Sequence, residues 1–192
     1  MRWQKLFLRL VKPLVKFIAN FRIRFTHYEI DGEEYYQIIS NLAPGDVFLT
    51  KARGEFTNLF NPSKGYSHGA IYVGKFDGRD YVIEATKKGV QMCDLVSFLT
   101  SKDGVMQLRA IVDIDDTVLR NESMKLSGKK YDYEFESNDD EYYCFELVYH
   151  LLKASIDQEI YLPKTGILGH NFYSAESFTN NPLFDLVAKV GK

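Results

Sequence analysis

The sequence predicts an α+β fold, and three observations support this. The 192 residues are 45% hydrophobic and 15% aromatic with only five prolines, a globular composition with enough apolar material for a core. Strand-like runs come first, and helical spacing surrounds them. The chain shows no regular alternation of strand and helix, which argues against a parallel sheet with crossover helices.

The expected strands are four apolar or β-branched runs. They cover residues 47–51, 68–74, 81–85 and 105–112, and a fifth, short strand is expected at 131–135. The dipeptide Asp77-Gly78 lies between the second and third runs, where it predicts the turn of a hairpin.

The expected helices are short and follow turn signals. They cover residues 32–41, 94–100, 115–127 and 142–154, with a last small helix near 174–178. Pro44 and Gly45 predict a turn over residues 42–46, and the remaining C-terminal segment is expected to be rich in loops.

Residues 1–25 form a basic amphipathic segment with seven basic side chains and no acidic one. The rest of the chain then holds 17 basic and 26 acidic side chains, a net charge of −9. Apolar residues recur every three or four positions, which predicts a helix kinked at Pro13. We divide the chain into this arm, residues 1–30, and a catalytic domain, residues 31–192. The arm either contacts a membrane surface or packs on the domain.

Two cysteines are too few for a disulfide framework, and the N-terminus has neither a signal peptide's uninterrupted apolar core nor its cleavage site. These features predict a cytoplasmic protein. The alternative is a cytoplasmic protein that associates peripherally with a membrane through the basic arm. No motif indicates a metal, an organic cofactor or a nucleic-acid partner.

His68 and Glu84 are a candidate pair on adjacent strands. If the hairpin closes at Asp77-Gly78, residues whose numbers sum to about 155 face each other, which sets Glu84 opposite Ile71 and near His68. A carboxylate that holds one histidine nitrogen fixes the tautomer and makes the other nitrogen more basic. A lone histidine on a strand is more often a satisfied core residue.

Cys144 lies near the start of the helix expected at 142–154. Asn138, Asp139 and Asp140 are favourable N-cap types, so Cys144 should fall in the first or second turn. Backbone N–H groups there stabilise a thiolate and can donate to the oxyanion of a tetrahedral intermediate. One cysteine on an apolar helix is by itself more often a buried hydrophobe.

Five short motifs carry a family resemblance. In chain order they are Pro44-Gly45-Asp46-Val47, Ser67-His68-Gly69-Ala70-Ile71-Tyr72-Val73-Gly74, Val82-Ile83-Glu84-Ala85, Tyr131-Asp132-Tyr133-Glu134-Phe135 and Tyr143-Cys144-Phe145-Glu146-Leu147-Val148. Over residues 42–187 the chain resembles the circularly permuted papain-like NlpC/P60 enzymes, above all the YiiX/YebB/YaeF branch, with lecithin:retinol acyltransferase as a more distant relative.

The resemblance implies an antiparallel sheet packed on a helix that bears the catalytic cysteine. It implies Cys144 as the nucleophile, His68 as the general base and Glu84 as the residue that orients it. Tyr131 or Tyr143 would assist at the oxyanion site. The residue after the cysteine is usually serine in such sequences and is Phe145 here, which leaves the polarity of the cleft open.

The expected function is therefore a cysteine-dependent amidase or peptidase that works through a thioester. Peptide, cell-wall and lipid acyl substrates all fit, so a lipid-directed acyltransferase or acyl hydrolase stays an alternative. A binding module that has lost its chemistry is another, suggested by Phe145.

Two further motifs are set aside. Asp113 and Asp115 fit the nucleophile motif of magnesium-dependent phosphatases, but that motif normally opens its domain, and here an acidic helix start explains it. Residues 162–166 spell a sortase sorting signal, but the apolar span and basic tail that must follow it are missing.

Overall fold

The computed structural model describes residues 13, 30–51, 65–135, 140–167 and 170–191. The predicted N-terminal helix, and with it nearly all of the arm at residues 1–30, lies outside these residues. The elements, in chain order, are α2 Gly32–Ile39, β1 Val47–Lys51, β2 His68–Phe76, β3 Arg79–Thr86, β4 Gly89–Asp94, α3 Leu95–Leu99, β5 Gly104–Ala110, α4 Asp116–Leu126, α5 Cys144–Ser155, β6 Thr165–Ile167, β7 His170–Phe172, α6 Ala175–Thr179 and β8 Phe184–Gly191.

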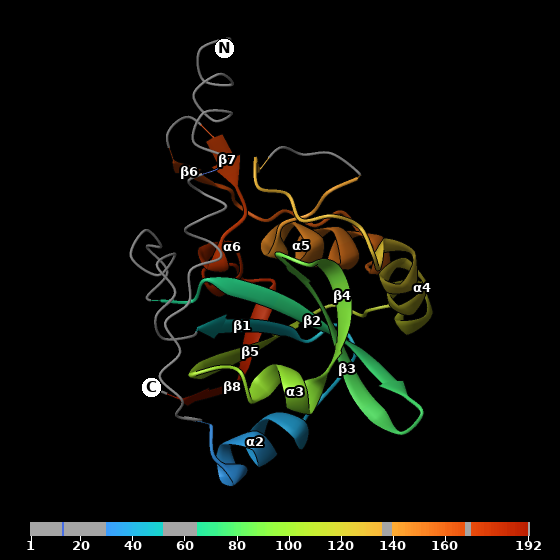
Figure 1. Cartoon of the computed structure of the whole chain (residues 1–192), viewed down its shortest axis with the longest axis vertical. Coiled ribbons are helices and arrows are strands. Elements are labelled where there is room, and N and C mark those ends of the chain that lie inside the picture. The colour runs from blue at the N-terminus through green and yellow to red at the C-terminus, as the bar shows by residue number, and fades with distance from the viewer. Residues whose placement is uncertain (1–12, 14–29, 52–64, 136–139, 168–169, 192) are drawn as a thin grey trace.

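The described part of the chain is built around one six-stranded antiparallel sheet. The strand order is β4-β3-β2-β1-β5-β8, and β6 and β7 form a separate two-stranded ribbon. Helices α4 and α5 lie over one face of the sheet, and α2 and α3 cover the other (Figure 1). This arrangement confirms the α+β prediction.

Strand alternation divides the apolar residues between two cores. In β2, Ile71 and Val73 join the core under α4 and α5, whereas Ala70 and Tyr72 join the core under α2 and α3. Because both faces are covered, the central strands are apolar almost without interruption, and this is why the sequence pattern identified them.

The β2–β3 hairpin closes at the predicted Asp77-Gly78 turn. Both residues have positive φ, 49° and 78°, as a two-residue type I′ turn requires. The hairpin loop is shorter than the six residues that the pattern suggested, because β2 runs to Phe76 and β3 starts at Arg79.

A β-bulge interrupts this hairpin and changes its register. Gly74 pairs with Tyr81, but beyond the bulge Ala70 pairs with Glu84. The prediction that Glu84 faces Ile71 is therefore wrong by one residue. The bulge needs glycine: Gly74 has φ +104°, and a Cβ there would lie 2.6 Å from the guanidinium of Arg120.

All four long strands and all the helices predicted within the described residues are present, with ends that shift by a few residues. Four strands escaped prediction. β4 is short and carries polar side chains, and β6 and β7 have only three residues each. β8 lies at the sheet edge, where most of its side chains are half or fully exposed. The C-terminal segment is therefore less rich in loops than predicted.

The short strand predicted at 131–135 is wrong, because these residues form a turn. The buried Asp132 carboxylate accepts hydrogen bonds from the backbone N–H groups of Glu134 at 2.7 Å and Phe135 at 2.9 Å. Phe135 has φ +53°, which is incompatible with an extended strand.

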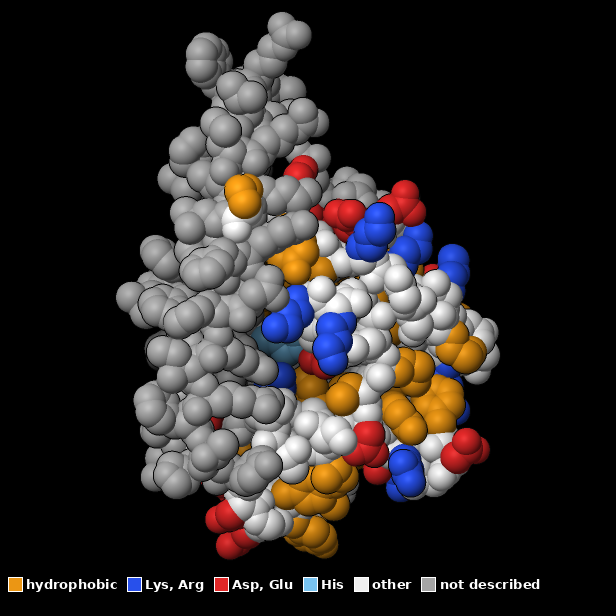
Figure 2. All heavy atoms as spheres, in the orientation of Figure 1, with side chains coloured by type: hydrophobic (Ala, Val, Ile, Leu, Met, Phe, Trp, Pro, Cys, Tyr) orange, Lys and Arg blue, Asp and Glu red, His pale blue; other side chains and the backbone are white. Residues whose placement is uncertain are grey.

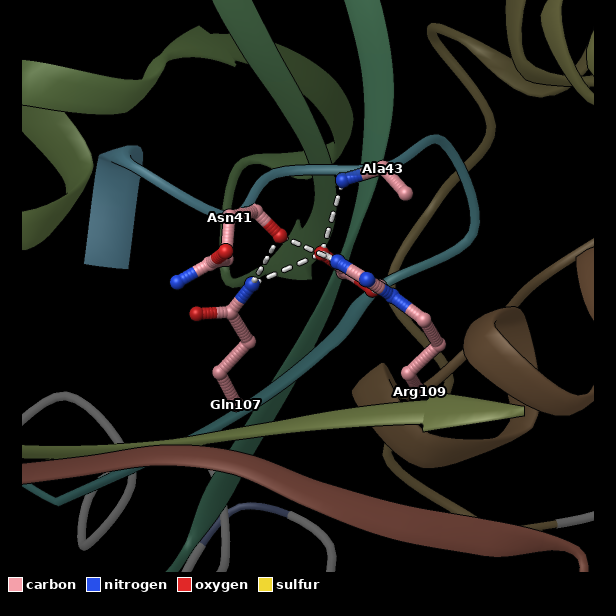
Figure 3. A network of polar contacts seen from close by, with 5 residues as sticks. Asn41, Ala43, Gln107 and Arg109 are labelled. Carbon is pink, nitrogen blue, oxygen red and sulfur yellow. Dashed lines mark hydrogen bonds and ion pairs between the residues drawn. The ribbon is translucent and has the colours of Figure 1, made fainter. Parts of the chain in front are cut away.

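A buried carboxylate ties the loop before β1 to β5 (Figure 3). Asp46 is fully buried and accepts hydrogen bonds from the Ala43 N–H at 2.9 Å and the Gln107 amide at 2.7 Å. Arg109 donates to both carboxylate oxygens, at 2.7 and 2.8 Å, and also to the Asn41 carbonyl. Burial of this charge is therefore compensated on both oxygens.

Replacing this carboxylate should destabilise the whole sheet. We expect Asp46→Ala to lower the free energy of unfolding by about 3 kcal/mol in urea denaturation, because three donors lose their acceptor. Asp140→Ala removes an exposed carboxylate that pairs with Lys129 and should barely move the unfolding midpoint. A loss no larger than that of the control would contradict this account.

Candidate active site

The bulge in β2 brings His68 and Glu84 to the same face of the sheet. Directly paired residues share a face, and Ala70, the partner of Glu84, lies two residues from His68. The Nε2 atom of His68 is 2.8 Å from Oε2 of Glu84. In the predicted register, without the bulge, Glu84 would have pointed to the opposite face.

A second hydrogen bond holds the Glu84 carboxylate. The Gln91 side chain, on β4, donates to Oε1 of Glu84 at 3.1 Å. The Glu84 side chain is only 8% exposed and that of His68 17%, so the pair is largely shielded from water. Gln91 is a supporting residue that the sequence did not reveal, because its strand was not predicted.

Helix α5 places Cys144 at its first residue. The N-cap is Tyr143, with extended backbone and no side-chain hydrogen bond to the helix. Cys144 therefore lies in the first turn, as predicted, but not because of an acidic cap. Of the expected caps, Asn138 and Asp139 lie outside the described residues, and Asp140 is instead an exposed partner of Lys129 at 2.9 Å.

One packing contact sets the distance between the helix and the histidine strand. Phe145, the residue after Cys144, is buried with its ring over Gly69, the residue after His68. A Cβ at Gly69 would lie 2.8 Å from the Phe145 ring. The ring also lies 6.0 Å from that of Phe178 on α6. Phe145 thus belongs to the core and replaces the usual serine without supplying a polar group.

The His68 side chain is hydrogen-bonded to Glu84, and it also interacts with Cys144. Burial and the charge of Lys102 lower the pKa of His68, but its interactions with Cys144 and Glu84 outweigh them and raise it to about 9. The imidazole therefore stays protonated at neutral pH.

Glu84 is ionised over the same range. Burial raises the pKa of Glu84, but the hydrogen bond from His68, the charges of His68 and Lys102 and the Gln91 amide lower it to about 2. The result is a carboxylate that holds an imidazolium, which in turn meets the thiol side chain.

The two candidate tyrosines have different surroundings. Burial, and then the charge of Cys144, raise the pKa of Tyr131 well above 10, so its hydroxyl remains a donor near the sulfur. The Tyr143 hydroxyl instead accepts a hydrogen bond from the backbone N–H of Tyr173 at 2.7 Å. The charge of Cys144 is therefore a larger cause of the raised pKa for Tyr131 than for Tyr143.

Basic side chains lie beside a partly visible histidine, and others are mixed with acidic ones along the margin of the same face (Figure 2). One buried cation acts on the pKa of His68. Lys102, in the loop after α3, is 8% exposed, and its ammonium lies 4.6 Å from the Phe98 ring centroid. No sequence motif distinguishes it from the other lysines.

The two aspartates of the phosphatase motif are not part of this site. Asp115 is the N-cap of α4, where it accepts hydrogen bonds from the N–H groups of Thr117 and Val118, which is the helix-start interpretation. Within the described ranges, no group of three or more His, Cys, Asp and Glu side chains is arranged to hold a metal. No helix among the same residues is long and apolar enough to cross a bilayer.

Comparisons with known proteins agree with this geometry. A family model described as a permuted papain-like amidase enzyme, YaeF/YiiX, C92 family, matches residues 41–185. A crystal structure titled metalloprotein yiiX, from Escherichia coli O157:H7, shares the fold with a TM-score of 0.66 and 19% identity. The match covers 78% of this chain and 98% of the other. No curated protein sequence matches. The chain therefore belongs to the YaeF/YiiX branch of the permuted papain-like amidases, the C92 family.

Proposed function

We propose that this protein is a cysteine amidase that cleaves its substrate through a thioester on Cys144. The observation that carries the proposal is the position of His68, which is hydrogen-bonded to a buried carboxylate and interacts with a cysteine at a helix start. These are a nucleophile, a proton carrier and an orienting acid in contact with one another.

In the acylation step, the Cys144 thiolate attacks the carbonyl carbon of an amide and a C–S bond forms. The His68 imidazolium gives its proton to the leaving nitrogen, the C–N bond breaks, and the amine departs. Glu84 keeps the ring oriented throughout, because its carboxylate accepts from Nε2. The other ring nitrogen is then the one that faces the thiol and the leaving group.

In the deacylation step, neutral His68 takes a proton from water while the water oxygen attacks the thioester carbonyl. The C–S bond breaks, the acid leaves, and the thiolate–imidazolium pair is restored. An amine or alcohol in place of water would give acyl transfer by the same sequence, which is why the lipid acyltransferase reading stays the alternative.

Two groups are positioned to stabilise the oxyanion. The first backbone N–H groups of α5 have no intrahelical acceptor, and the described residues supply no side-chain cap. The protonated Tyr131 hydroxyl is the second donor that we propose. Phe145 argues weakly for the non-catalytic alternative, because its ring fills the core instead of replacing a catalytic group.

The thioester gives the first prediction. Incubation with p-nitrophenyl acetate should place a hydroxylamine-sensitive acetyl group on Cys144, detected by intact-protein and peptide mass spectrometry. Cys144→Ala should lose the adduct. His68→Ala should slow acylation by about 10²- to 10⁴-fold, the usual contribution of general acid–base catalysis.

Cys93→Ser is the matched control for this experiment, since it removes the other free cysteine, which lies on β4, and should leave the adduct unchanged. An adduct that persists in Cys144→Ala, or a His68→Ala rate equal to that of the wild type, would rule out the proposed roles.

The pKa of His68 gives the second prediction. The imidazole should titrate near pH 9 instead of near 6.5 when its ¹³Cε1 shift is followed by NMR. Because the hydrogen bond that His68 donates to Glu84 stabilises the imidazolium, Glu84→Gln should move the midpoint of this titration to lower pH. Glu122→Gln, on α4, removes a carboxylate paired only with Lys125 and should not move it. A wild-type midpoint near 6.5 would contradict the charged pair.

The basic N-terminal segment suggests where the substrate is met. We propose that the protein is cytoplasmic and that residues 1–25, with seven basic side chains and no acidic one, bring it to an anionic membrane surface. The substrate would then be a peptide-like or lipid-linked amide at that surface.

Liposome co-sedimentation tests this idea. The full chain should bind vesicles that contain phosphatidylserine and lose most of the binding in 0.5 M salt or after deletion of residues 1–25, because screening removes the electrostatic attraction. Vesicles of phosphatidylcholine alone are the control. Equal binding by the intact and the shortened chains would refute the membrane role.

A further inference from the structure

We propose that Lys102 is a positioning residue of this site, whose buried charge keeps His68 able to release its proton. The inference deepens the proposed cysteine mechanism and rests on it for the charged state of Cys144. Neither the family comparison nor the sequence motifs assign a role to this lysine.

The geometry starts from the loop between α3 and β5. The backbone N–H of Lys102 donates to the Leu99 carbonyl at 3.0 Å, which anchors the residue to the end of α3. Its ammonium lies 4.6 Å from the centroid of the Phe98 ring. The same ring lies 6.3 Å from the imidazole of His68. Phe98 thus contacts both the Lys102 ammonium and the His68 imidazole. Because Phe98 belongs to α3, this helix fixes the distance of each group from the ring.

The charges of the site explain why a cation is needed there. His68 faces Cys144 from α5, Glu84 from β3 and Lys102 from the loop after α3. A thiolate and a carboxylate around one imidazolium leave a net negative charge in a largely buried place, and burial of net charge is unfavourable. Lys102 supplies a second positive charge beside these groups.

The sign of the effect follows from this arrangement. Both anions stabilise the protonated ring, and each therefore makes His68 a weaker acid for the leaving nitrogen. Among the neighbouring charges, Lys102 acts most strongly in the opposite direction on the pKa of His68. It also lowers the pKa of Glu84, so the orienting carboxylate stays ionised. Cys93, on β4, is a further titratable neighbour of Glu84 and Lys102.

The test is the titration of the His68 imidazole in the full chain, followed by NMR. Lys102→Met keeps much of the aliphatic stem and removes the charge, and should raise the midpoint by roughly one pH unit, the size of effect that one nearby charge has at a shielded site. Lys102→Arg keeps the charge and should titrate as the wild type does.

Lys153→Met is the matched control, because Lys153 also lies over an aromatic ring, at 6.0 Å from Tyr149, but on the exposed side of α5. It should leave the midpoint unchanged. If Lys102→Met fails to fold, Lys102→Gln is read in its place. An unmoved midpoint in a folded charge-free variant would overturn the proposal, and so would loss of folding in both, which would make Lys102 a structural residue.

The titration needs no turnover, so its outcome is separable from that of the amidase proposal. A raised midpoint without any acyl adduct would support the role of Lys102 and refute the thioester. An adduct on Cys144 with an unmoved midpoint would support the thioester and refute the role of Lys102.

Discussion

The hydrogen bond between His68 and Glu84 depends on one extra residue in β2. The bulge between Tyr72 and Gly74 shifts the pairing so that Glu84 faces Ala70, on the side of the sheet to which His68 points. Gly74 makes this possible, since its positive φ would be strained for a residue with a side chain. The pairing of His68 with Glu84 thus depends on a glycine that lies several residues away from both.

The distance between the proposed nucleophile and the proposed base has a separate structural cause. Phe145 packs over Gly69, and each is the immediate neighbour of a site residue, Cys144 on the helix and His68 on the strand. A close-packed contact between ring and backbone is stiff, so the helix start cannot drift from the strand. The large apolar residue after the cysteine therefore serves the geometry of the site through packing.

The sequence predicted what depends on apolar runs and turn chemistry. The four long strands, the Asp77-Gly78 turn and the helix that carries Cys144 near its start all followed from such local signals. Register and edge pairing did not follow, because they are decided between segments. The only local sign of the bulge is Gly74, and a glycine in an apolar run does not define the register. The strand β8 is stabilised by pairing with β5 more than by its own residue pattern. Gln91 and Lys102 were missed for the same reason.

The hydrogen bond between the Tyr173 N–H and the Tyr143 hydroxyl links the residue before the nucleophile to a segment made 30 positions later. The Gly191 N–H likewise bonds to Glu34, at the opposite end of the described fold. A ribosome-bound chain that has emerged only as far as α5 would carry its cysteine without these supports. The surroundings of the proposed nucleophile are therefore completed only late in synthesis.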